Sequence, residues 1–318
     1  MLIWIIDEEW PGYELEKKAV YDAYPDCDLR FSKNDYAADL EEFGKNADAI
    51  ICQISVDMGR ETIEKLEHCK VISVYGVGYN NVDTEAAKKK GIKVCNVPGY
   101  CAEDVSDYVI AAIYERCKLW KEYSPEDGLW GAQAASQPVY RISSQKLLIL
   151  GFGRIGRMIA QKALKAGMQV EIYDPYVSDE DAEQAGTKKV DLREGLAWAD
   201  FVSLNMILCE ETKHMISEKE LALMKNTAYI INASRGGTLD TDALIKAVQK
   251  GQIAGAVLDV LEEEPPQANA PVLKCPGIKI TPHISFYSED SLNELQESAA
   301  KNALRILAGE DIAEIVNR

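Results

Sequence analysis

The chain lacks several features that would assign it to a class at once. Its 318 residues contain no run of about 18 uncharged apolar residues, so we expect no transmembrane helix. The N-terminus reads MLIWIIDEEW, with acidic residues after the apolar run and no basic residues before it, which is typical of a first β-strand and not of a signal peptide. The eight cysteines show neither CxxC pairs nor metal-ligand spacing, so we expect buried thiols in a reducing cytosol and no metal site.

Basic charge is also scarce. The 52 Asp and Glu outnumber the 35 Lys and Arg, and the resulting net charge of −17 disfavours nonspecific nucleic-acid binding. A hydrophobic content of 47% over 318 residues suits about two domains with substantial cores. We therefore expect a soluble cytoplasmic protein with neither a nucleic-acid nor a membrane partner, although a local basic pocket for an anionic substrate stays open.

The clearest local pattern lies in residues 146–174, KLLILGFGRIGRMIAQKALKAGMQVEIYD. An apolar run at residues 147–150 enters the glycine-rich segment 151–156, a helical pattern follows, and a second apolar run at residues 170–173 ends on Asp174. Strand, glycine turn, helix, strand and acid in this order predict a dinucleotide-binding unit.

Each glycine of this segment has a predicted task. Gly151 permits the tight turn, Gly153 lets the backbone approach a pyrophosphate, and Gly156 lets the helix pack against its strand. Arg154 and Ile155 lie in the same segment, and the free N–H groups and the positive dipole end at the N-terminus of the helix that follows would meet the diphosphate. We expect this whole segment to bind the cofactor.

The acid at the end of the second strand predicts which dinucleotide is bound. The Asp174 carboxylate can accept hydrogen bonds from the 2′- and 3′-hydroxyls of an adenosine ribose, and it would repel a 2′-phosphate. The sequence therefore predicts NAD in preference to NADP.

Apolar runs alternate with helical patterns along the rest of the chain. We expect strands at residues 2–6, 48–54, 70–74, 92–96, 201–204, 228–232, 254–259 and 278–280. We expect helices at residues 14–24, 60–69, 84–90, 103–123, 218–224, 241–250 and 288–307. This alternation predicts an α/β fold with two doubly wound parallel-sheet lobes. Because the last helix should return to the first lobe, we expect a discontinuous lobe of residues 1–98 and 286–318 around a dinucleotide-binding lobe of residues 99–285.

An aromatic, loop-rich stretch at residues 121–141 connects the long helix to the glycine segment. Trp120, Tyr123, Trp130 and Tyr140 lie in or beside it. Exposed aromatics often mark an interface, but these side chains could equally cover the core of their own lobe.

Three polar residues follow strands that should end at one edge of the second sheet. These are Arg235, Glu264 and His283, and open α/β sheets bind ligands at that edge. An arginine can bind a carboxylate with its planar fork, and a glutamate can orient and charge a histidine. Each has a structural alternative: a salt bridge for Arg235, a solvated acidic run for Glu264, and a structural histidine at position 283. The other two histidines, His68 and His214, lie in polar surroundings and are simplest as surface residues.

From about residue 45 onward the chain resembles the NAD-dependent D-2-hydroxyacid dehydrogenase family. The matching motifs are YGVGYNNVD at 75–83, NVPG at 96–99, GFGRIG at 151–156, NASRGG at 232–237, LDVLEEEPP at 258–266 and TPHISFYS at 281–288. The segments NVPGYCAEDVSDY and HISFYSEDS are similar to a branch that includes the C-terminal-binding-protein corepressors and bacterial dehydrogenases. The resemblance implies a flavodoxin-like substrate lobe, a Rossmann NAD-binding lobe and a homodimer formed through the NAD-binding lobes.

The resemblance also implies roles for individual residues. The catalytic arginine, glutamate and histidine of the family fall on Arg235, Glu264 and His283. Asp259 falls where the family contacts the nicotinamide carboxamide. Positions expected beside the cofactor or the substrate are Val77, Gly78, Met206, Ala233, Ser234 and Phe286. Among these, the backbone N–H groups of Val77 and Gly78 would bind the substrate carboxylate, and Phe286 would lie near the substrate.

These roles imply reversible hydride transfer between NAD(H) and a small 2-ketoacid or D-2-hydroxyacid. Glu264 would favour the protonated form of His283, and His283 would exchange the proton with the substrate. Arg235 would bind the substrate and polarise its carbonyl. The alternative is an NAD(H)-sensing, corepressor-like interaction protein with incidental dehydrogenase activity.

Departures from the family pattern narrow the substrate. Residues 52–55 lack the arginine of phosphoglycerate dehydrogenases, Val74 replaces a substrate-binding arginine of other members, and Glu264 stands where formate dehydrogenases have glutamine. Phosphoglycerate, formate and phosphonate-like acids are therefore disfavoured. Phe286 and its aliphatic neighbours favour a ketoacid with an uncharged, moderately bulky side chain.

Overall fold

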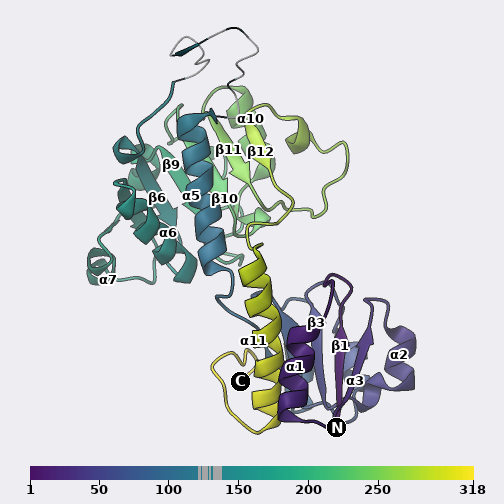
Figure 1. Cartoon of the computed structure of the whole chain (residues 1–318). Helices are drawn as coiled ribbons and strands as arrows, with labels where there is room; N and C mark the ends of the chain where they lie inside the picture. The colour runs from purple at the N-terminus through teal and green to yellow at the C-terminus, as the bar shows by residue number, and fades with distance from the viewer. Residues whose placement is uncertain (121–122, 124–127, 129, 132–137) are drawn as a thin grey trace. The chain divides into compact units, whose positions relative to one another are not determined.

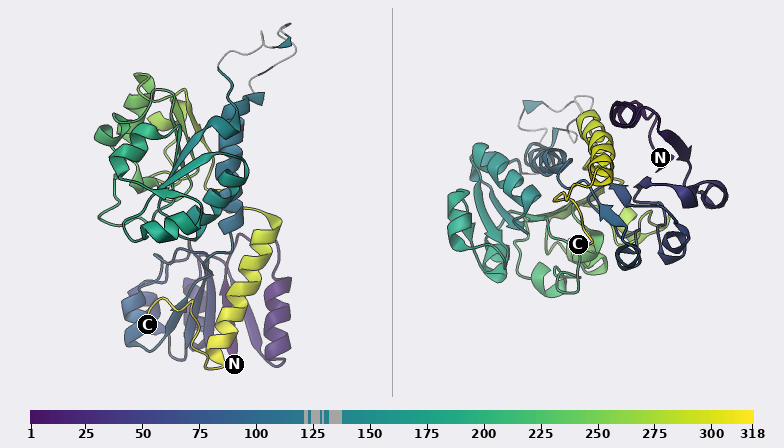
Figure 2. Two further views of the ribbon diagram at one scale, coloured as in Figure 1. Left: turned by 90° about the vertical axis from the view of Figure 1, so that its left-hand side faces the viewer. Right: turned by 90° about the horizontal axis from the view of Figure 1, so that it is seen from below.

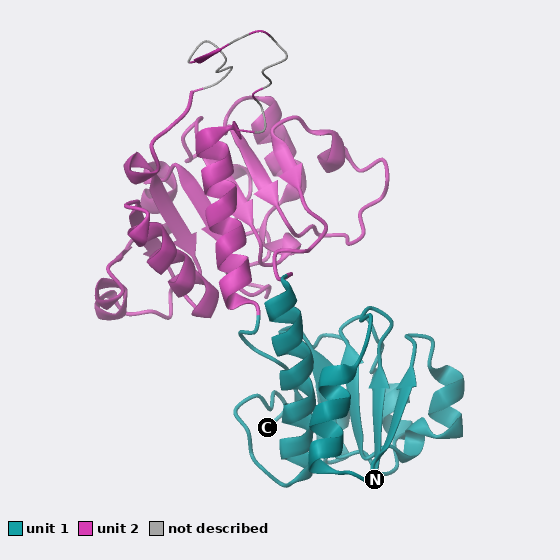
Figure 3. Cartoon of the chain, in the orientation of Figure 1, with its two compact units in different colours: residues 1–100, 288–318 teal, residues 101–287 magenta. Residues whose placement is uncertain are grey.

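The computed structural model describes residues 1–120, 123, 128, 130–131 and 138–318 (Figure 1). They form two compact units, one of Met1–Tyr100 with Ser288–Arg318 and the other of Cys101–Tyr287 (Figure 3). The divisions lie close to the predicted boundaries at 98/99 and 285/286. Each unit holds an all-parallel sheet with helices on its faces, as the predicted α/β fold requires.

The first unit is built on a five-stranded sheet in the order β2-β1-β3-β4-β5. Its strands are β1 (Leu2–Ile6), β2 (Asp28–Ser32), β3 (Ala49–Gln53), β4 (Val71–Tyr75) and β5 (Lys93–Cys95). Its helices are α1 (Glu14–Ala23), α2 (Ala37–Glu42), α3 (Arg60–Lys65), α4 (Thr84–Lys89) and α11 (Glu289–Leu307), with a 3-10 turn η1 (Gly44–Asn46). Helix α11 packs along α1 and against β3 and β4 (Figures 1 and 2). The core strands β1, β3 and β4 are almost wholly apolar because helices cover both faces of the sheet.

The second unit is built on a seven-stranded sheet in the order β12-β11-β10-β9-β6-β7-β8. Its strands are β6 (Lys146–Leu150), β7 (Gln169–Tyr173), β8 (Lys188–Lys189), β9 (Phe201–Leu204), β10 (Tyr229–Asn232), β11 (Gly255–Leu258) and β12 (Ile278–Ile280). Its helices are α5 (Ala102–Lys118), α6 (Arg154–Lys165), α7 (Asp179–Gln184), α8 (Leu192–Trp198), α9 (Glu218–Leu221) and α10 (Thr241–Gln249), with 3-10 turns η5 (Ile142–Ser144), η6 (Gly236–Thr238) and η7 (Pro271–Lys274).

Alternating side chains of β6 pack into two separate hydrophobic cores of the second unit. Leu147 and Ile149 pack with residues of α5 and α6, whereas Leu148 and Leu150 pack with residues of α8, α9 and α10. This division follows from the two-residue period of a strand, and it leaves the carboxyl edge of the sheet for the loops that carry polar residues.

Several predicted elements were wrong in extent. The helix predicted at 103–123 ends at Lys118, because Leu119 takes a left-handed conformation with φ 52°; residues 121 and 122 lie outside the described residues. The helix predicted at 60–69 ends at Lys65, because Leu66 is extended and buries its side chain. The helix predicted at 218–224 ends at Leu221. Strand β2 was missed because its side chains are mostly exposed and form no apolar run.

The aromatic stretch predicted as an interface lies mostly outside the described residues. Trp120 and Trp130 are described, and both are well exposed. Elsewhere in the described chain, no helix combines the length and apolarity that a membrane crossing requires.

Candidate active site

Glycine is required at two positions of the turn between β6 and α6. Gly151 has φ +89°, and a Cβ there would lie 2.8–2.9 Å from backbone atoms of Asn205 and Met206. A Cβ on Gly156 would lie 2.2 Å from the carbonyl oxygen of Gly151, so only glycine lets the helix lie against the turn. A Cβ on Gly153 would meet no atom within 4 Å, which leaves open space on that side of the turn.

This turn presents the N-terminus of α6 to the carboxyl edge of the sheet. Gly153 is the N-cap and has no side-chain capping bond, and Arg154 and Ile155 form the first helical positions. The partial positive charge at a helix N-terminus suits an anionic diphosphate. No capping side chain therefore competes with a phosphate for the first N–H groups.

Asp174 joins the end of β7 to the glycine turn. Parallel pairing of β6 with β7 aligns Leu150 with Tyr173, so the two residues that follow these strands leave the sheet side by side. One carboxylate oxygen of Asp174 accepts the N–H of Phe152 at 2.7 Å and the other accepts the N–H of Tyr176 at 2.8 Å. The carboxylate is thus fixed beside the glycine turn, and its predicted contact with a ribose stays a prediction.

Three parallel strands bring the predicted catalytic residues to one edge. The register aligns Asn232 of β10 with Leu258 of β11, and Leu258 with Ile280 of β12. The segments that carry Arg235, Glu264 and His283 follow these three strand ends. Neighbouring strands lie about 4.8 Å apart, so the three segments begin close together at one edge of the sheet.

His283 and Glu264 form a hydrogen-bonded pair. His283 Nδ1 lies 2.6 Å from Glu264 Oε2, and the other oxygen of Glu264 accepts the N–H of Leu261 at 2.7 Å. The side chains are 41% and 34% exposed, so solvent and ligand can reach the ring. Within the described residues His283 Nε2 has no hydrogen-bond partner, so it is the ring nitrogen available for proton exchange. The ring of Phe286 lies edge-on, with its centroid 6.4 Å from that of His283.

Asp259 organises the segment that carries His283. Asp259 is buried, with 1% of the residue exposed. It accepts the hydroxyl of Thr281 at 2.5 Å and the N–H groups of Ile284 and Ser285 at 2.9 Å. Its backbone carbonyl accepts the N–H of His283 at 2.9 Å. Asp259 therefore fixes the segment from Thr281 to Ser285. Its predicted contact with a nicotinamide carboxamide stays a prediction.

The loop of Arg235 packs tightly against the loop of Glu264. A Cβ on Gly236 would lie 2.0 Å from the carbonyl carbon of Leu261, so the two backbones touch. The guanidinium of Arg235 donates to the carbonyl of Ser234 at 2.7 Å, which uses only one of its N–H groups. The predicted cofactor neighbours Met206, Ala233 and Ser234 are all partly buried.

The predicted substrate contacts of the first unit lie in the loop after β4. Val77 is 40% exposed, and its carbonyl accepts the side-chain amide of Asn96 at 2.7 Å. Gly76, with φ +150°, donates its N–H to the carbonyl of Val74. These two hydrogen bonds tie the loop that contains Val77 and Gly78 to the end of β4 and to Asn96.

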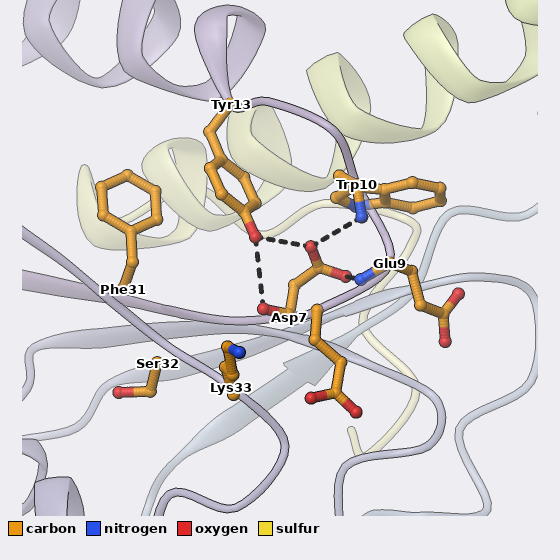
Figure 4. Close-up of a pocket in the computed structure, with 8 residues that line it drawn as sticks. Asp7, Glu9, Trp10, Tyr13, Phe31, Ser32 and Lys33 are labelled. Atoms are coloured by element: carbon orange, nitrogen blue, oxygen red, sulfur yellow. Dashed lines mark hydrogen bonds between the residues drawn. The ribbon is translucent and has the colours of Figure 1, made fainter.

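The first unit also contains an open cavity of about 690 Å³ at the carboxyl ends of β1 and β2 (Figure 4). One oxygen of Asp7 accepts the N–H of Glu9, and the other accepts the N–H of Trp10 and the hydroxyl of Tyr13. Burial and the Asp7 contact raise the pKa of Tyr13, so this hydroxyl stays a donor. The residues that line the cavity include none of the predicted site residues.

Sequence reasoning missed a second histidine–glutamate pair. His214 Nε2 lies 2.7 Å from Glu262 Oε2, and the N–H of His214 donates to the carbonyl of Gly237 at 2.8 Å. The prediction of a simple surface residue therefore overlooked a link between the 205–217 segment and the loops of Arg235 and Glu264. No local sequence pattern signals this link, because the partners are distant in the chain. In the part of the chain that is described, no three His, Cys, Asp or Glu residues are grouped to hold a metal ion.

Comparison with known proteins assigns the family. Residues 108–285 match the model described as D-isomer specific 2-hydroxyacid dehydrogenase, NAD binding domain. A glyoxylate reductase of Thermococcus litoralis is 36% identical over 286 residues, which cover 88% of this chain and 86% of that protein. A solved protein of Thermus thermophilus superimposes with a TM-score of 0.85 at 29% identity and covers 99% of this chain and 100% of its own. The D-lactate dehydrogenase of Aquifex aeolicus, solved with NAD and lactic acid, has a TM-score of 0.80 at 28% identity and covers 97% of this chain and 96% of its own. The prediction of family and cofactor is confirmed: the chain belongs to the D-isomer-specific 2-hydroxyacid dehydrogenases, an NAD-linked oxidoreductase family, and residues 108–285 are its NAD-binding domain.

Proposed function

We propose that the protein reversibly reduces a small 2-ketoacid to its D-2-hydroxyacid, with His283 as general acid and base. The observation that carries this proposal is the 2.6 Å pairing of His283 with Glu264 at the carboxyl edge of the NAD-binding domain. The accessible ring nitrogen Nε2 donates a proton to the oxygen of the carbonyl during reduction and removes it during oxidation. Negative charge on Glu264 stabilises the protonated ring before the transfer.

Arg235 binds the substrate carboxylate and polarises the carbonyl. Its planar guanidinium suits both tasks because it keeps several N–H donors after bonding to Ser234. The backbone N–H groups of Val77 and Gly78, in the first unit, are also proposed as substrate contacts. NADH, when bound, supplies the hydride that adds to C2 of the ketoacid.

We assign cofactor binding to the glycine turn and its neighbours. Gly151, Gly153, Arg154, Ile155 and Gly156 receive the diphosphate at the N-terminus of α6. Asp174 receives the ribose hydroxyls and repels a 2′-phosphate, so turnover with NADH should exceed turnover with NADPH. Residues proposed to lie beside the nicotinamide half are Met206, Ala233, Ser234 and Asp259. A clear preference for NADPH would remove the argument for Asp174.

The proposed substrates are ketoacids with an uncharged side chain. Relatives named glyoxylate reductase and D-lactate dehydrogenase make glyoxylate and pyruvate the first compounds to test. Phe286, 6.4 Å from the His283 ring between centroids, would contact the substrate side chain. We therefore expect moderately bulky ketoacids to be accepted better than acids with a charged side chain.

The test is a panel of 2-ketoacids with NADH or NADPH, followed by nicotinamide absorbance. His283→Ala should lower kcat by about 10²- to 10⁴-fold on the best substrate. His68→Ala is the matched control, since His68 is exposed and lies in the other unit. Near-normal turnover of His283→Ala would remove this assignment.

We also propose a homodimer formed through the NAD-binding domains. The exposed Trp120 and Trp130, which lie in the second unit, support a contact surface there. Light scattering after size-exclusion chromatography should give twice the 35.3 kDa chain mass. A single-chain mass at micromolar concentration would contradict the proposal.

A further inference from the structure

A chain of hydroxyl groups links helix α5 to the segment that carries His283. The hydroxyl of Tyr108 lies 2.7 Å from Thr281 Oγ1, and Thr281 Oγ1 lies 2.5 Å from Asp259 Oδ1. An ionised carboxylate can only accept hydrogen bonds, so the single proton of Thr281 points to Asp259. Thr281 must then accept from Tyr108, which sets the direction of both bonds.

Tyr108 is well suited to be the terminal donor. Burial raises the pKa of its hydroxyl to about 12, so the group keeps its proton at neutral pH. The residue lies on α5, whose buried side chains pack against the second-unit core. The donor is therefore attached to a helix and not to a loop.

The segment beyond Thr281 needs this support because His283 has φ 54°. A residue other than glycine in this left-handed region is disfavoured by about 1–2 kcal/mol and persists only when surrounding bonds hold it. The N–H of His283 donates to the carbonyls of Asp259 and Thr281, and the carboxylate of Asp259 holds the N–H groups of Ile284 and Ser285. Thr281 and Asp259 are thus the anchor of the strained turn, and Tyr108 fixes the hydroxyl of that anchor.

We propose that Tyr108 is a positioning residue that, through Thr281 and Asp259, holds the His283 ring in place for proton transfer. This inference rests on the proposed role of His283. Tyr108 itself has no contact with the reacting atoms in this scheme. Its hydroxyl orients the Thr281–Asp259 bond, and that bond sets the turn from which the ring reaches Glu264.

Tyr108→Phe removes the hydroxyl and keeps the ring that packs on the core. We expect kcat for the best ketoacid to fall about fivefold, since one ordinary hydrogen bond is lost, while KM for NADH stays unchanged. Tyr114→Phe is the matched control, because it removes a hydroxyl from the same helix without touching Thr281. Thr281→Ser keeps the bonded hydroxyl and should retain activity, whereas Thr281→Val removes the hydroxyl and should lower kcat. In the Thr281→Val background, adding Tyr108→Phe should lower kcat no further.

A second measurement observes His283 without turnover. The chain has three histidines, so imidazole signals of isotopically labelled protein can be assigned with His283→Ala and His68→Ala. Tyr108→Phe should move the His283 signals and leave those of His68 and His214 in place. If Tyr108→Phe does not fold, Thr281→Val provides the same comparison from the other end of the bond.

The two measurements separate the possible failures. Full turnover by His283→Ala would remove the proposed function, and the position of the His283 signals would still decide whether Tyr108 holds the ring. With His283 essential, an unchanged kcat or unchanged His283 signals in folded Tyr108→Phe would overturn the positioning role. An equal loss of kcat in Tyr114→Phe would overturn it as well, because the effect would then belong to the helix.

Discussion

Replacing Glu264 by glutamine would isolate the charge of the His283–Glu264 pair. Glutamine keeps an oxygen that can accept the N–H of Leu261, which Glu264 Oε1 accepts at 2.7 Å. The loop should therefore keep its conformation while the negative charge beside His283 Nδ1 disappears. Any loss of activity then reports on electrostatics and not on a misplaced loop.

The size of the effect follows from the geometry of the pair. Two unit charges about 4 Å apart interact by about 4 kcal/mol at an effective dielectric of 20 and by about 1 kcal/mol in water. The side chains are 41% and 34% exposed, so screening places this pair towards the lower value. We expect a loss of about 1–2 kcal/mol, which lowers kcat for ketoacid reduction by about 5- to 30-fold.

The assay is initial-rate reduction of the best ketoacid by NADH between about pH 6 and pH 9. Glu263→Gln is the control, since it removes the same charge from the neighbouring position. The reasoning would be refuted by Glu264→Gln rates within about twofold of wild type across this range, or by an equal loss in Glu263→Gln.

Three further predictions test other parts of the chain. Gly156→Ala should destabilise the fold by about 1–3 kcal/mol and weaken NADH binding, because its Cβ would lie 2.2 Å from the Gly151 carbonyl oxygen. In Gly153→Ala the added Cβ meets no atom within 4 Å, so this variant should keep the melting temperature of the wild type. Only its affinity for NADH, measured by fluorescence, should fall. Cys209 should be the one thiol that is alkylated rapidly in the native protein, because hydrogen bonds from Thr212 lower its pKa while the other seven cysteines are buried. Mass spectrometry should show a single adduct, and that adduct should be absent in Cys209→Ser. Glu16→Gln should raise the melting temperature by roughly 2–4 °C at pH 7 and by nothing near pH 4: burial raises the pKa of Glu16, so the folded state binds the extra proton and the wild type loses stability as pH rises through that raised pKa.

The NAD-binding segment could be predicted from the sequence because its determinants are local. Gly151, Gly156 and Asp174 act within one strand–turn–helix–strand unit, so their spacing along the chain is also their spacing in space. The core strands were predictable for a related reason: strands buried on both faces must be apolar throughout. The edge strand β2 has one or no buried face and therefore carries no such pattern.

The support of His283 could not be predicted in the same way. Tyr108, Asp259 and Thr281 lie in three separate segments of the chain, and no spacing along the sequence indicates that their side chains meet. The pairing of His214 with Glu262 was missed for the same reason. Helix ends at Lys65 and Lys118 were also decided by tertiary packing, since no proline or glycine follows to stop either helix.

By itself the sequence determined the two-sheet α/β class, the dinucleotide turn with its acid, and the candidate trio Arg235, Glu264 and His283. These follow from periodicity, from glycine conformations and from polar residues at strand ends, all of which are written along the chain. Only the tertiary structure decided how the His283 ring is held, because hydrogen bonds between distant segments depend on which strands pair and in what register. The parallel alignment of β10, β11 and β12 brings the three loops together, and the buried carboxylate of Asp259 then fixes the turn that carries His283.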